Sequence, residues 1–408
     1  MTMGTRFERD LPDLLADLYP ESAPSYRDDI VRRIATTRQR PAWTFPERWL
    51  PMGVITLTRQ TMSPVPWRTF GLLAALALLL AAAMALYVGG QRRLPPAFGP
   101  AANGALVVGH GGDIYLIDPA TGDRTLAIGG PTIDSDPVFS RDGTRFAFYR
   151  EDGGRRGLFV ADAHGQGVAE LSTTGLADVG AIDWSPDGSS ILVSGNDTRP
   201  GTVAIVPVDG SAARVLDFAI PVEDAVWVPP DGREILFRTP GEVPNVYGLV
   251  VARADGTGSR MLVPPPGTAA ADWSGLYFAP SPDGSEVAFQ WRDESGTLKI
   301  FLVPAAGGTP RAITTVESVL PRWSPDGARI AFAGPDGFYA VGTGDPAPET
   351  RLVAGSRGLL ARWAPDGTHL VLLTDGGRML LVDPTGGPSV EATWSATNLP
   401  DWQRLAAP

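Results

Sequence analysis

The sequence predicts an all-β fold: a seven-bladed β-propeller closed by a strand shared between its N- and C-terminal ends, preceded by a short helical region and one transmembrane helix. Three observations support this prediction. A five-residue turn recurs six times, with its aspartates at steps of 40 to 52 residues. A short apolar strand follows every copy of the turn. One uncharged, apolar run of nineteen residues lies upstream of all six copies. A period of this size marks a repeat architecture.

Residues 1–69 form a first region, for which the pattern predicts short helices. Apolar residues recur at helical spacing after Asp10, and Ser25 with Asp28 resembles a capping box before a second helix. Prolines interrupt the remainder. Three aromatic residues cluster close to the predicted membrane: Trp43, Phe45 and Trp49. Two interpretations stay open, because these rings could rest on the bilayer surface or form a docking motif for a cytoplasmic partner.

Residues 70–88 carry no charge and are rich in Leu and Ala. At about 1.5 Å per residue they span roughly 29 Å, which matches a hydrocarbon core of about 30 Å. Trp67 and Tyr87 lie at the two ends, where amphipathic aromatic rings favour the headgroup level. A cleaved signal peptide would have a shorter apolar run and would begin close to the N-terminus. We therefore expect a single membrane helix with the lipid bilayer as its partner.

The orientation of this helix is predicted from its basic flanks. Arginines close to the two ends balance one another, but the wider N-terminal flank adds Arg40 and Arg48, whereas the other flank adds nothing before Arg124. The positive-inside rule then places the N-terminus in the cytoplasm and the propeller outside the cell membrane. Residues 89–103, which are rich in Pro and Gly, are expected to link the helix to a propeller that spans 104–408.

The repeated turn has the chemistry of a type I turn that ends in Asp-Gly. Pro presets φ, Asp hydrogen-bonds to the backbone beyond it, and Gly adopts the left-handed conformation at low cost. The six copies are Phe139–Gly143, Trp184–Gly188, Val228–Gly232, Pro280–Gly284, Trp323–Gly327 and Trp363–Gly367. Apolar strands follow at 146–148, 191–193, 235–237, 287–289, 330–332 and 370–372, and most units add a second one. Four strands in roughly 44 residues is the unit of a propeller blade.

A seventh blade is predicted from the two ends of the domain. Residues 105–129 supply three strands without a preceding Asp-Gly turn, and Leu399–Trp402 supplies the missing first strand. We expect residues 397–403 to pair with residues 104–110 as the inner strand. Closure of the ring in this way removes exposed strand edges that would otherwise pair with other chains.

The repeated Trp-Ser-Pro-Asp-Gly signature resembles that of the TolB-like, WD-repeat-like β-propeller family. The resemblance covers residues 103–408 and implies the fold strongly, whereas such propellers serve adaptor, ligand-binding and protease-associated roles. This chain departs from TolB itself in two ways. It lacks the N-terminal α/β domain, and its predicted membrane segment has no counterpart there.

Charge and composition narrow the classes of partner. Residues 103–408 contain 22 basic and 37 acidic residues, a net charge of −15. A surface this acidic repels phosphate backbones, so we expect no nucleic-acid partner. The chain has no cysteine, which excludes disulfides, zinc–thiolate sites and thiol nucleophiles.

The search for catalytic residues gives no candidate, and we expect neither an enzyme nor a cofactor or metal. No nucleophile elbow, zinc-protease helix or phosphate loop occurs. The three histidines, His110, His164 and His369, fall in different blades, which argues against a shared metal or triad.

One set of charged residues is a candidate binding site. The residue before the signature Trp, on the predicted innermost strand, is charged in four blades: Asp183, Arg322, Arg362 and Asp401. Innermost strands line the central channel, so these residues could form a polar ring that holds a ligand. Alternatively, Arg362 and Asp401 pair with each other and only neutralise a buried charge.

The sequence as a whole favours a membrane-anchored propeller that binds a protein, peptide or glycan outside the cytoplasm. One alternative is transmembrane signalling of the anti-sigma type, with residues 1–69 contacting a cytoplasmic partner, although the His-Cys zinc motif common in that family is absent. The other is an extracytoplasmic hydrolase with an acid/base pair in its channel.

Overall fold

The computed structural model divides the chain into two compact units, Met1–Gly90 and Gln91–Pro408. It describes residues 94–173, 180–194, 203–242, 246–265, 276–344, 348–355, 360–374, 378–394, 396 and 398–406, all in the second unit. The helical region predicted for 1–69, the membrane helix predicted for 70–88 and the first part of the linker lie outside the described residues. Within the described ranges, no helix is long and apolar enough to cross a membrane.

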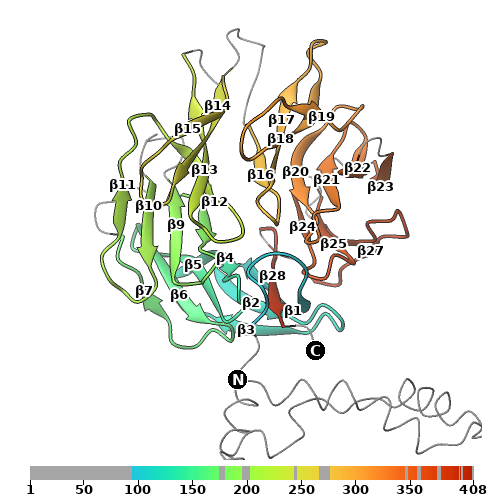
Figure 1. Ribbon diagram of the computed structural model, residues 1–408. Helices are drawn as coiled ribbons and strands as arrows, with labels where there is room; N and C mark the ends of the chain where they lie inside the picture. The colour runs from blue at the N-terminus through green and yellow to red at the C-terminus, as the bar shows by residue number, and fades with distance from the viewer. Residues whose placement is uncertain are drawn as a thin grey trace, which may run out of the picture. The chain divides into compact units, whose positions relative to one another are not determined.

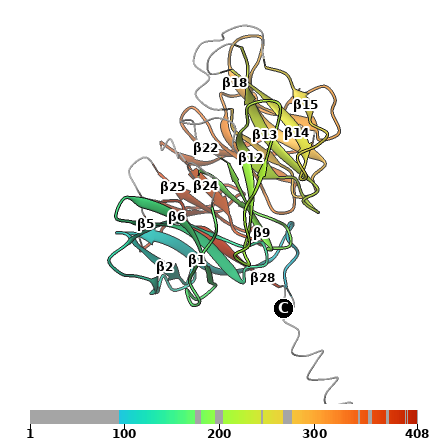
Figure 2. The same cartoon turned by 90° about the vertical axis from the view of Figure 1, so that its left-hand side faces the viewer.

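The described part of the chain is an all-β propeller of seven four-stranded antiparallel sheets (Figures 1 and 2). The predicted fold class is therefore confirmed. Each sheet is one blade, and the first strands of neighbouring blades contact one another. Examples are the contacts of β28 (Asp401–Leu405) with β24 (Leu360–Trp363) and with β4 (Ile133–Phe139). These first strands are the innermost strands of the ring.

The blades are numbered from the composite one, and each is given with its innermost strand first. Blade 1 contains β28 (Asp401–Leu405), β1 (Ala102–His110), β2 (Asp113–Ile117) and β3 (Arg124–Ile128). Blade 2 contains β4 (Ile133–Phe139), β5 (Arg145–Asp152), β6 (Arg155–Asp162) and β7 (Ala169–Glu170). Blade 3 contains β8 (Ile182–Trp184), β9 (Ser190–Ser194), β10 (Val203–Pro207) and β11 (Arg214–Leu216). Blade 4 contains β12 (Glu223–Trp227), β13 (Glu234–Pro240), β14 (Tyr247–Arg253) and β15 (Arg260–Val263).

The remaining three blades follow the same order. Blade 5 contains β16 (Phe278–Pro280), β17 (Glu286–Arg292), β18 (Leu298–Pro304) and β19 (Arg311–Ala312). Blade 6 contains β20 (Val319–Trp323), β21 (Arg329–Ala333), β22 (Gly337–Gly342) and β23 (Glu349–Ala354). Blade 7 contains β24 (Leu360–Trp363), β25 (Leu370–Leu373), β26 (Met379–Val382) and β27 (Val390–Glu391).

The ring is closed by the strand at the C-terminal end of the chain. β28 pairs antiparallel with β1, so that Trp402 lies opposite Leu106 and Asp401 opposite Val107 (Figure 1, red beside cyan). The shared blade is as predicted, but the C-terminal partner begins at Asp401 rather than near 397. Pro400 precedes it, and a proline has no N–H to donate to a strand ladder, so pairing starts after it.

The six Asp-Gly turns adopt the predicted conformation. Their glycines all have φ between +65° and +74°. In each turn, the aspartate Oδ1 accepts the backbone N–H two residues further on, at 2.9 to 3.1 Å. Gly143 also has no room for a side chain, because a Cβ there would lie 2.0 Å from the carbonyl oxygen of Arg404. The turn of blade 2 therefore packs directly on the strand that closes the ring.

Adjacent blades are held together by apolar clusters and by the signature tryptophans. In four blades, the indole N–H donates to the backbone carbonyl of the inner strand in the preceding blade: Trp184 to Val138, Trp227 to Asp183, Trp323 to Ala279 and Trp363 to Arg322, at 2.9 to 3.2 Å. Each of these carbonyls belongs to the residue that precedes the preceding blade's own signature position. The repeat therefore fixes the inner strands against one another and so sets the geometry of the channel.

Candidate functional site

A cavity of about 330 Å³ lies on the axis of the ring, at the end where the Asp-Gly turns are. Its lining includes one residue from each blade: Arg404, Arg141, Asp183, Trp227, Phe278, Arg322 and Arg362, in blade order. Only the axis of a ring adjoins all of its blades, so this axial cavity is one end of the central channel. Residues 97–99, which lead into β1, also line it.

Asp183, one of the four predicted ring residues, is fully engaged in the fold. Its Oδ2 accepts the backbone N–H of Trp227 from the next blade at 2.8 Å. Its Oδ1 accepts a hydrogen bond from the guanidinium of Arg141 in the preceding blade. The carboxylate therefore joins three consecutive blades, and both of its oxygens are used.

Asp401 repeats this arrangement in the blade that closes the ring. Its Oδ2 accepts the backbone N–H of Phe139 from the next blade at 2.8 Å, and its Oδ1 lies 3.3 Å from Nε of Arg362 in the preceding blade. The pairing between Arg362 and Asp401, which the sequence left as an alternative, is present in the structure. Asp401 itself is not among the residues that line the axial cavity.

Arg322 differs from the other ring residues because its guanidinium makes no ion pair or hydrogen bond with any residue that the structure describes. The side chain borders the axial cavity. Burial, which removes water from the charged group, and repulsion by Arg362 together lower the pKa of Arg322 to about 10. The part of the Arg322 side chain that stays accessible therefore faces the cavity, while the remainder of the side chain is buried away from water.

Two further arginines, which do not stand at the repeat position before the signature Trp, also line the axial cavity. Arg141 lines the cavity from the turn of blade 2, and Arg404 lines it from β28. Arg404 donates to the carbonyl oxygens of Pro96 at 2.9 Å and Gly99 at 2.6 Å. Burial, and repulsion by Arg141, lower the pKa of Arg404 to about 10. One signal was available in the sequence, since Arg141 stands where the other five turns have proline.

The remaining walls of the axial cavity are almost entirely apolar. Three tryptophans and two phenylalanines contribute, together with prolines of the turns: Trp227, Trp323, Trp363, Phe98, Phe278, Pro229, Pro280, Pro282 and Pro325. Among the described lining residues the polar side chains are those of four arginines and one aspartate. The guanidinium Nε atoms of Arg141, Arg362 and Arg404 are buried and lack a hydrogen-bond partner. Donors are thus in excess over acceptors at this site.

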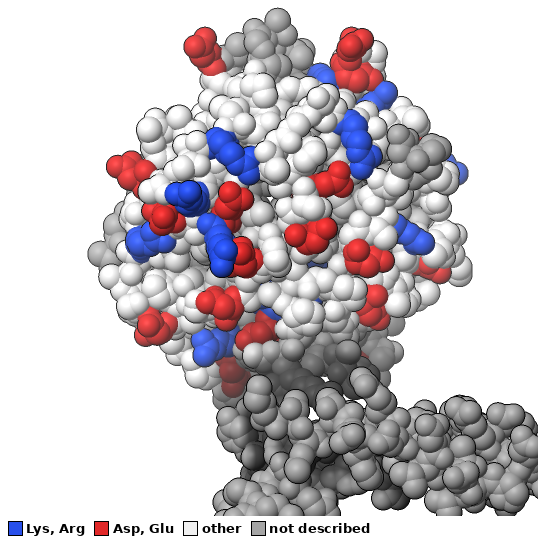
Figure 3. All heavy atoms as spheres, in the orientation of Figure 1, with Lys and Arg blue, Asp and Glu red and all other residues white. Residues whose placement is uncertain are grey.

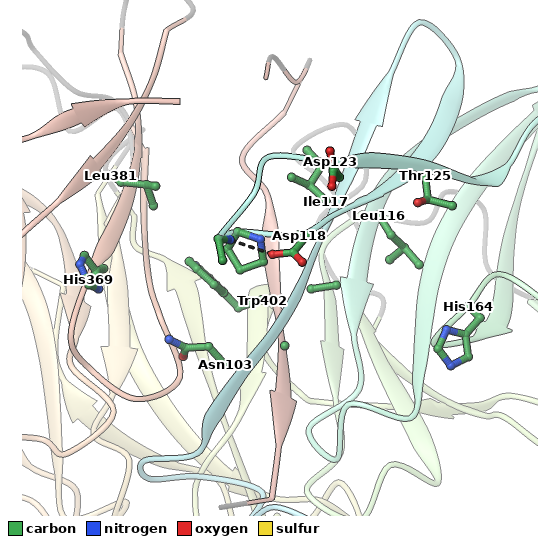
Figure 4. A pocket seen from close by; sticks show the side chains of 14 residues that line it. Asn103, Leu116, Ile117, Asp118, Asp123, Thr125, His164, His369, Leu381 and Trp402 are labelled. Carbon is green, nitrogen blue, oxygen red and sulfur yellow. Dashed lines mark hydrogen bonds between the residues drawn. The ribbon is translucent and has the colours of Figure 1, made fainter. Parts of the chain in front are cut away.

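A second, larger pocket of about 860 Å³ borders blade 1, and two of the three histidines line it. His369 and His164 lie on opposite sides of this pocket, with Trp402 and Asp118 between them (Figure 4). Asp118 is used by its own turn, where it accepts the backbone N–H of Ala120 at 2.8 Å. His110 does not line the pocket and instead meets the ring of Tyr115 edge-on. The histidines therefore do not converge.

No group of three His, Cys, Asp or Glu residues suited to hold a metal is present in the part of the chain that the structure describes. On the face shown in Figure 3, acidic and basic side chains are intermixed rather than separated. The arginines of the axial cavity are thus a local excess of positive charge inside a domain whose net charge is negative.

Comparisons with known proteins place the chain among propellers. No family model matches it. An uncharacterized protein of Agrobacterium fabrum, Atu1656, is 42% identical over 55 residues, which is 13% of this chain and 19% of that relative. The chain thus matches about a fifth of the length of this curated relative.

Solved structures resemble the chain over a larger part of its length. An oligogalacturonate lyase in complex with manganese has a TM-score of 0.54 at 14% identity, covering 71% of this chain and 85% of its own. A prolyl endopeptidase has a TM-score of 0.52 at 12% identity, covering 74% and 50%. TolB from Acinetobacter baumannii has a TM-score of 0.45 at 16% identity, covering 73% and 82%. At these identities, the similarity to the lyase and to the endopeptidase shows that the chain shares their propeller fold and shows nothing about its function.

Proposed function

We propose that this protein is a membrane-anchored β-propeller that binds a protein or peptide partner outside the cytoplasm through the axial cavity, without catalysing a reaction. One observation carries the proposal. The inner strands and turns of five of the seven blades bring four arginines and an aspartate to one apolar-walled cavity on the ring axis. A cavity with a few convergent polar groups in apolar walls is the usual form of a ligand site.

The cavity is suited to recognition because the fold holds its walls in place. The tryptophans that line it are fixed by indole hydrogen bonds to the preceding blade, and Asp183 is fixed by the backbone N–H of Trp227. Groups already held in position lose little conformational entropy when a partner binds, so more of the interaction energy appears as affinity.

The chemistry of the cavity supports binding rather than catalysis. Its described lining residues include no Ser, Thr, Cys, His or Lys that could act as nucleophile or general base. Asp183, the one carboxylate in the wall, already accepts from Trp227 and Arg141. The membrane anchor is proposed from the uncharged run at 70–88, and the external location of the propeller from the basic residues that precede it.

The proposal is tested by site-specific photo-crosslinking of the full-length protein in native membranes. A photoreactive residue replaces Phe278, which lines the axial cavity; as a control, one replaces Val390, which is 61% exposed on the outer strand β27. We expect a discrete crosslinked partner from position 278 but not from position 390. Reversing Arg322 and Arg362 to Glu should abolish it, whereas replacing all three histidines by Gln should not. Equal crosslinking from both positions, or none from 278, would refute the proposal.

A further inference from the structure

The charges around the axial cavity do not balance. Arg141 is paired with Asp183, and Arg362 is paired with Asp401. Arg322 has no ion-pair or hydrogen-bond partner among the described residues, and the Nη2 atom of Arg404 bonds to two backbone carbonyls rather than to a carboxylate. Neither of these two positive charges therefore has a carboxylate within ion-pair distance among the described residues. Asp401 attracts Arg404 only from farther away, and repulsion between neighbouring arginines adds to the cost of burying them. An excess of this kind favours the entry of an anionic group.

The walls indicate which anion fits. Every hydrogen-bond donor among the lining side chains, apart from the three indoles committed to the preceding blades, is a guanidinium. A guanidinium offers a planar fork of N–H groups that matches the two oxygens of a carboxylate. Four lining prolines have no N–H to offer, so the backbone of the turns contributes little to the ring of donors that a tetrahedral phosphate needs. The aromatic rings beside the arginines suit an apolar group attached to the carboxylate.

The net charge of the propeller restricts the kind of molecule that can present this carboxylate. The propeller has a net charge of −15, so a polyanion such as an acidic polysaccharide is repelled along its whole length. A partner with one carboxylate at its end and neutral or basic groups behind it avoids this repulsion. The cavity of about 330 Å³ lies at the lower end of the range of about 300–1,000 Å³ for ligand pockets, which favours a chain end over a larger body.

We propose that the axial cavity binds the C-terminal carboxylate of a peptide or protein whose last residue is apolar and whose preceding residues are neutral or basic. Arg322 is the principal contact, since its guanidinium is free and faces the cavity. This inference rests on the proposed function, because it specifies the partner of the same site.

The experiment uses the purified full-length protein and a synthetic hexapeptide with an acetylated N-terminus, two lysines and a C-terminal leucine. The peptide is made with a free carboxylate and as the C-terminal amide. Binding is followed by calorimetry and by intrinsic fluorescence, because Trp227, Trp323 and Trp363 line the cavity. The free acid should bind at least about tenfold more tightly than the amide, since the amide loses a charge-assisted hydrogen bond.

Variants link this preference to the cavity. Arg322→Gln should weaken binding of the free acid by about tenfold or more, and Arg322→Lys, which keeps the charge but loses the planar fork, should fall between. The matched control is Arg378→Gln, which removes an exposed arginine paired with Glu391 at 3.4 Å on the outer strands and should change nothing. Because the acid and amide are compared on the wild-type protein, the result does not depend on how a variant folds.

Three results would overturn the inference: equal affinity for acid and amide, unchanged affinity in Arg322→Gln, or displacement of the peptide by an equimolar amount of inorganic phosphate. The proposed function is judged separately by crosslinking at position 278. Crosslinks together with equal binding of acid and amide would refute the carboxylate site alone. Acid-selective binding without any crosslink in membranes would refute the proposed capture of a partner and leave the carboxylate site supported.

Discussion

Asp183 holds Trp227 at two points across the boundary between blades 3 and 4. Its Oδ2 accepts the backbone N–H of Trp227 at 2.8 Å, and its carbonyl oxygen accepts the indole N–H at 3.2 Å. Asp401 accepts the backbone N–H of Phe139 at 2.8 Å in the same manner. Both carboxylates also hold an arginine with their second oxygen. The acidic members of the predicted ring therefore connect neighbouring blades and position arginines. Because both of their oxygens are already used, the arginines rather than the carboxylates are the candidate contacts for a ligand.

Replacing Asp183 by Ala should destabilise the propeller. The change leaves the N–H of Trp227 and the guanidinium of Arg141 without their acceptor, and losses of this kind cost about 2–4 kcal/mol. The free energy of unfolding is measured by urea denaturation. Asp123→Ala is the control, because that side chain is exposed and contacts no hydrogen-bond or ion-pair partner among the described residues. If the two variants prove equally stable, the contact between Asp183 and Trp227 contributes nothing to the joining of the blades.

Removal of residues 397–408 should open the ring. β28 supplies the inner strand of blade 1, and without it β1 presents an unpaired edge over residues 102–107, which is a template for association with other chains. We expect aggregation, followed by light scattering, and loss of a cooperative melting transition. A chain that lacks only residues 407 and 408 keeps β28 and serves as the control. A soluble 397–408 deletion with an unchanged melting temperature would be incompatible with closure by the shared blade.

The fold could be predicted from the sequence because its repeated turns are formed by interactions between residues that are close together in the chain. Asp142 and Gly143 form their turn with neighbours a few residues away, and six copies of that turn fix the period and the number of blades. Closure was predictable for the same reason, since Trp402 continues the spacing of the signature tryptophans. The closing strand begins at Asp401 rather than near the predicted residue 397, because Pro400 carries no N–H for the strand ladder.

The site was predicted only in part, because its contacts depend on how the ring closes. Asp183 and Arg322 were found from their repeat position. Arg141 and Arg404 were missed, since each contacts a partner that is distant in the sequence: Asp183 in the next blade, 42 residues from Arg141, and Gly99 at the other end of the propeller, about 305 residues from Arg404. The separation of 42 residues is about one repeat, but Arg141 belongs to the turn rather than to the repeat position before the signature Trp, and no period connects Arg404 with Gly99.

Low pH should destabilise the propeller because the aspartates of the repeated turns become protonated. Hydrogen bonds from Ser281 and from the backbone N–H of Ser285 lower the pKa of Asp283 below its ordinary value of 3.8. A carboxyl with a lower pKa in the folded state adds stability that is present above its unfolded pKa and is lost as the pH falls through the folded one. The pKa values of Asp187, Asp326 and Asp366 are also lowered; burial alone would raise them, but hydrogen bonds from their own turns outweigh it.

We therefore expect the free energy of unfolding to fall steeply below a pH of about 4. The difference between the wild type and Asp283→Asn should be constant above a pH of about 5 and should shrink at lower pH as the wild-type carboxyl becomes protonated. Ser281→Ala, which removes one donor and keeps the carboxyl, should show a smaller change of the same sign. Urea denaturation between pH 3 and pH 7 provides the measurement. A difference that stays constant down to pH 3 would contradict this role of the turn.

The proposed topology predicts the outcome of proteolysis on spheroplasts. If the N-terminus is cytoplasmic, added protease should digest the propeller and leave a protected fragment that ends shortly after residue 88. An epitope at the N-terminus identifies this fragment by immunoblot, and lysed spheroplasts provide the control in which the fragment is digested as well. A propeller that survives in intact spheroplasts would reverse the orientation and move its partners into the cytoplasm.

Replacement by Met should change the free energy of unfolding in opposite directions at Arg322 and at Arg362. The pKa of Arg322 is lowered to about 10 by burial and by Arg362. A base whose folded pKa is lowered costs stability wherever it is charged in both states, and this cost is relieved only as the pH rises from about 10 toward the ordinary pKa of arginine. At neutral pH, Arg322→Met removes this cost and should raise the free energy of unfolding by about 1–2 kcal/mol.

Arg362→Met removes the partner of Asp401, whose carboxylate then stays buried with only the N–H of Phe139, and should lower the free energy of unfolding by about 2–3 kcal/mol. Urea denaturation of both variants at pH 7 tests the pair, and the double variant shows how much of the gain at Arg322 comes from relief of repulsion between the two. An arginine that destabilises the fold and contacts no partner within it is one that a ligand can pair. If Arg322→Met instead destabilises the protein as much as Arg362→Met does, Arg322 supports the fold, and the case for a ligand contact at this position is lost.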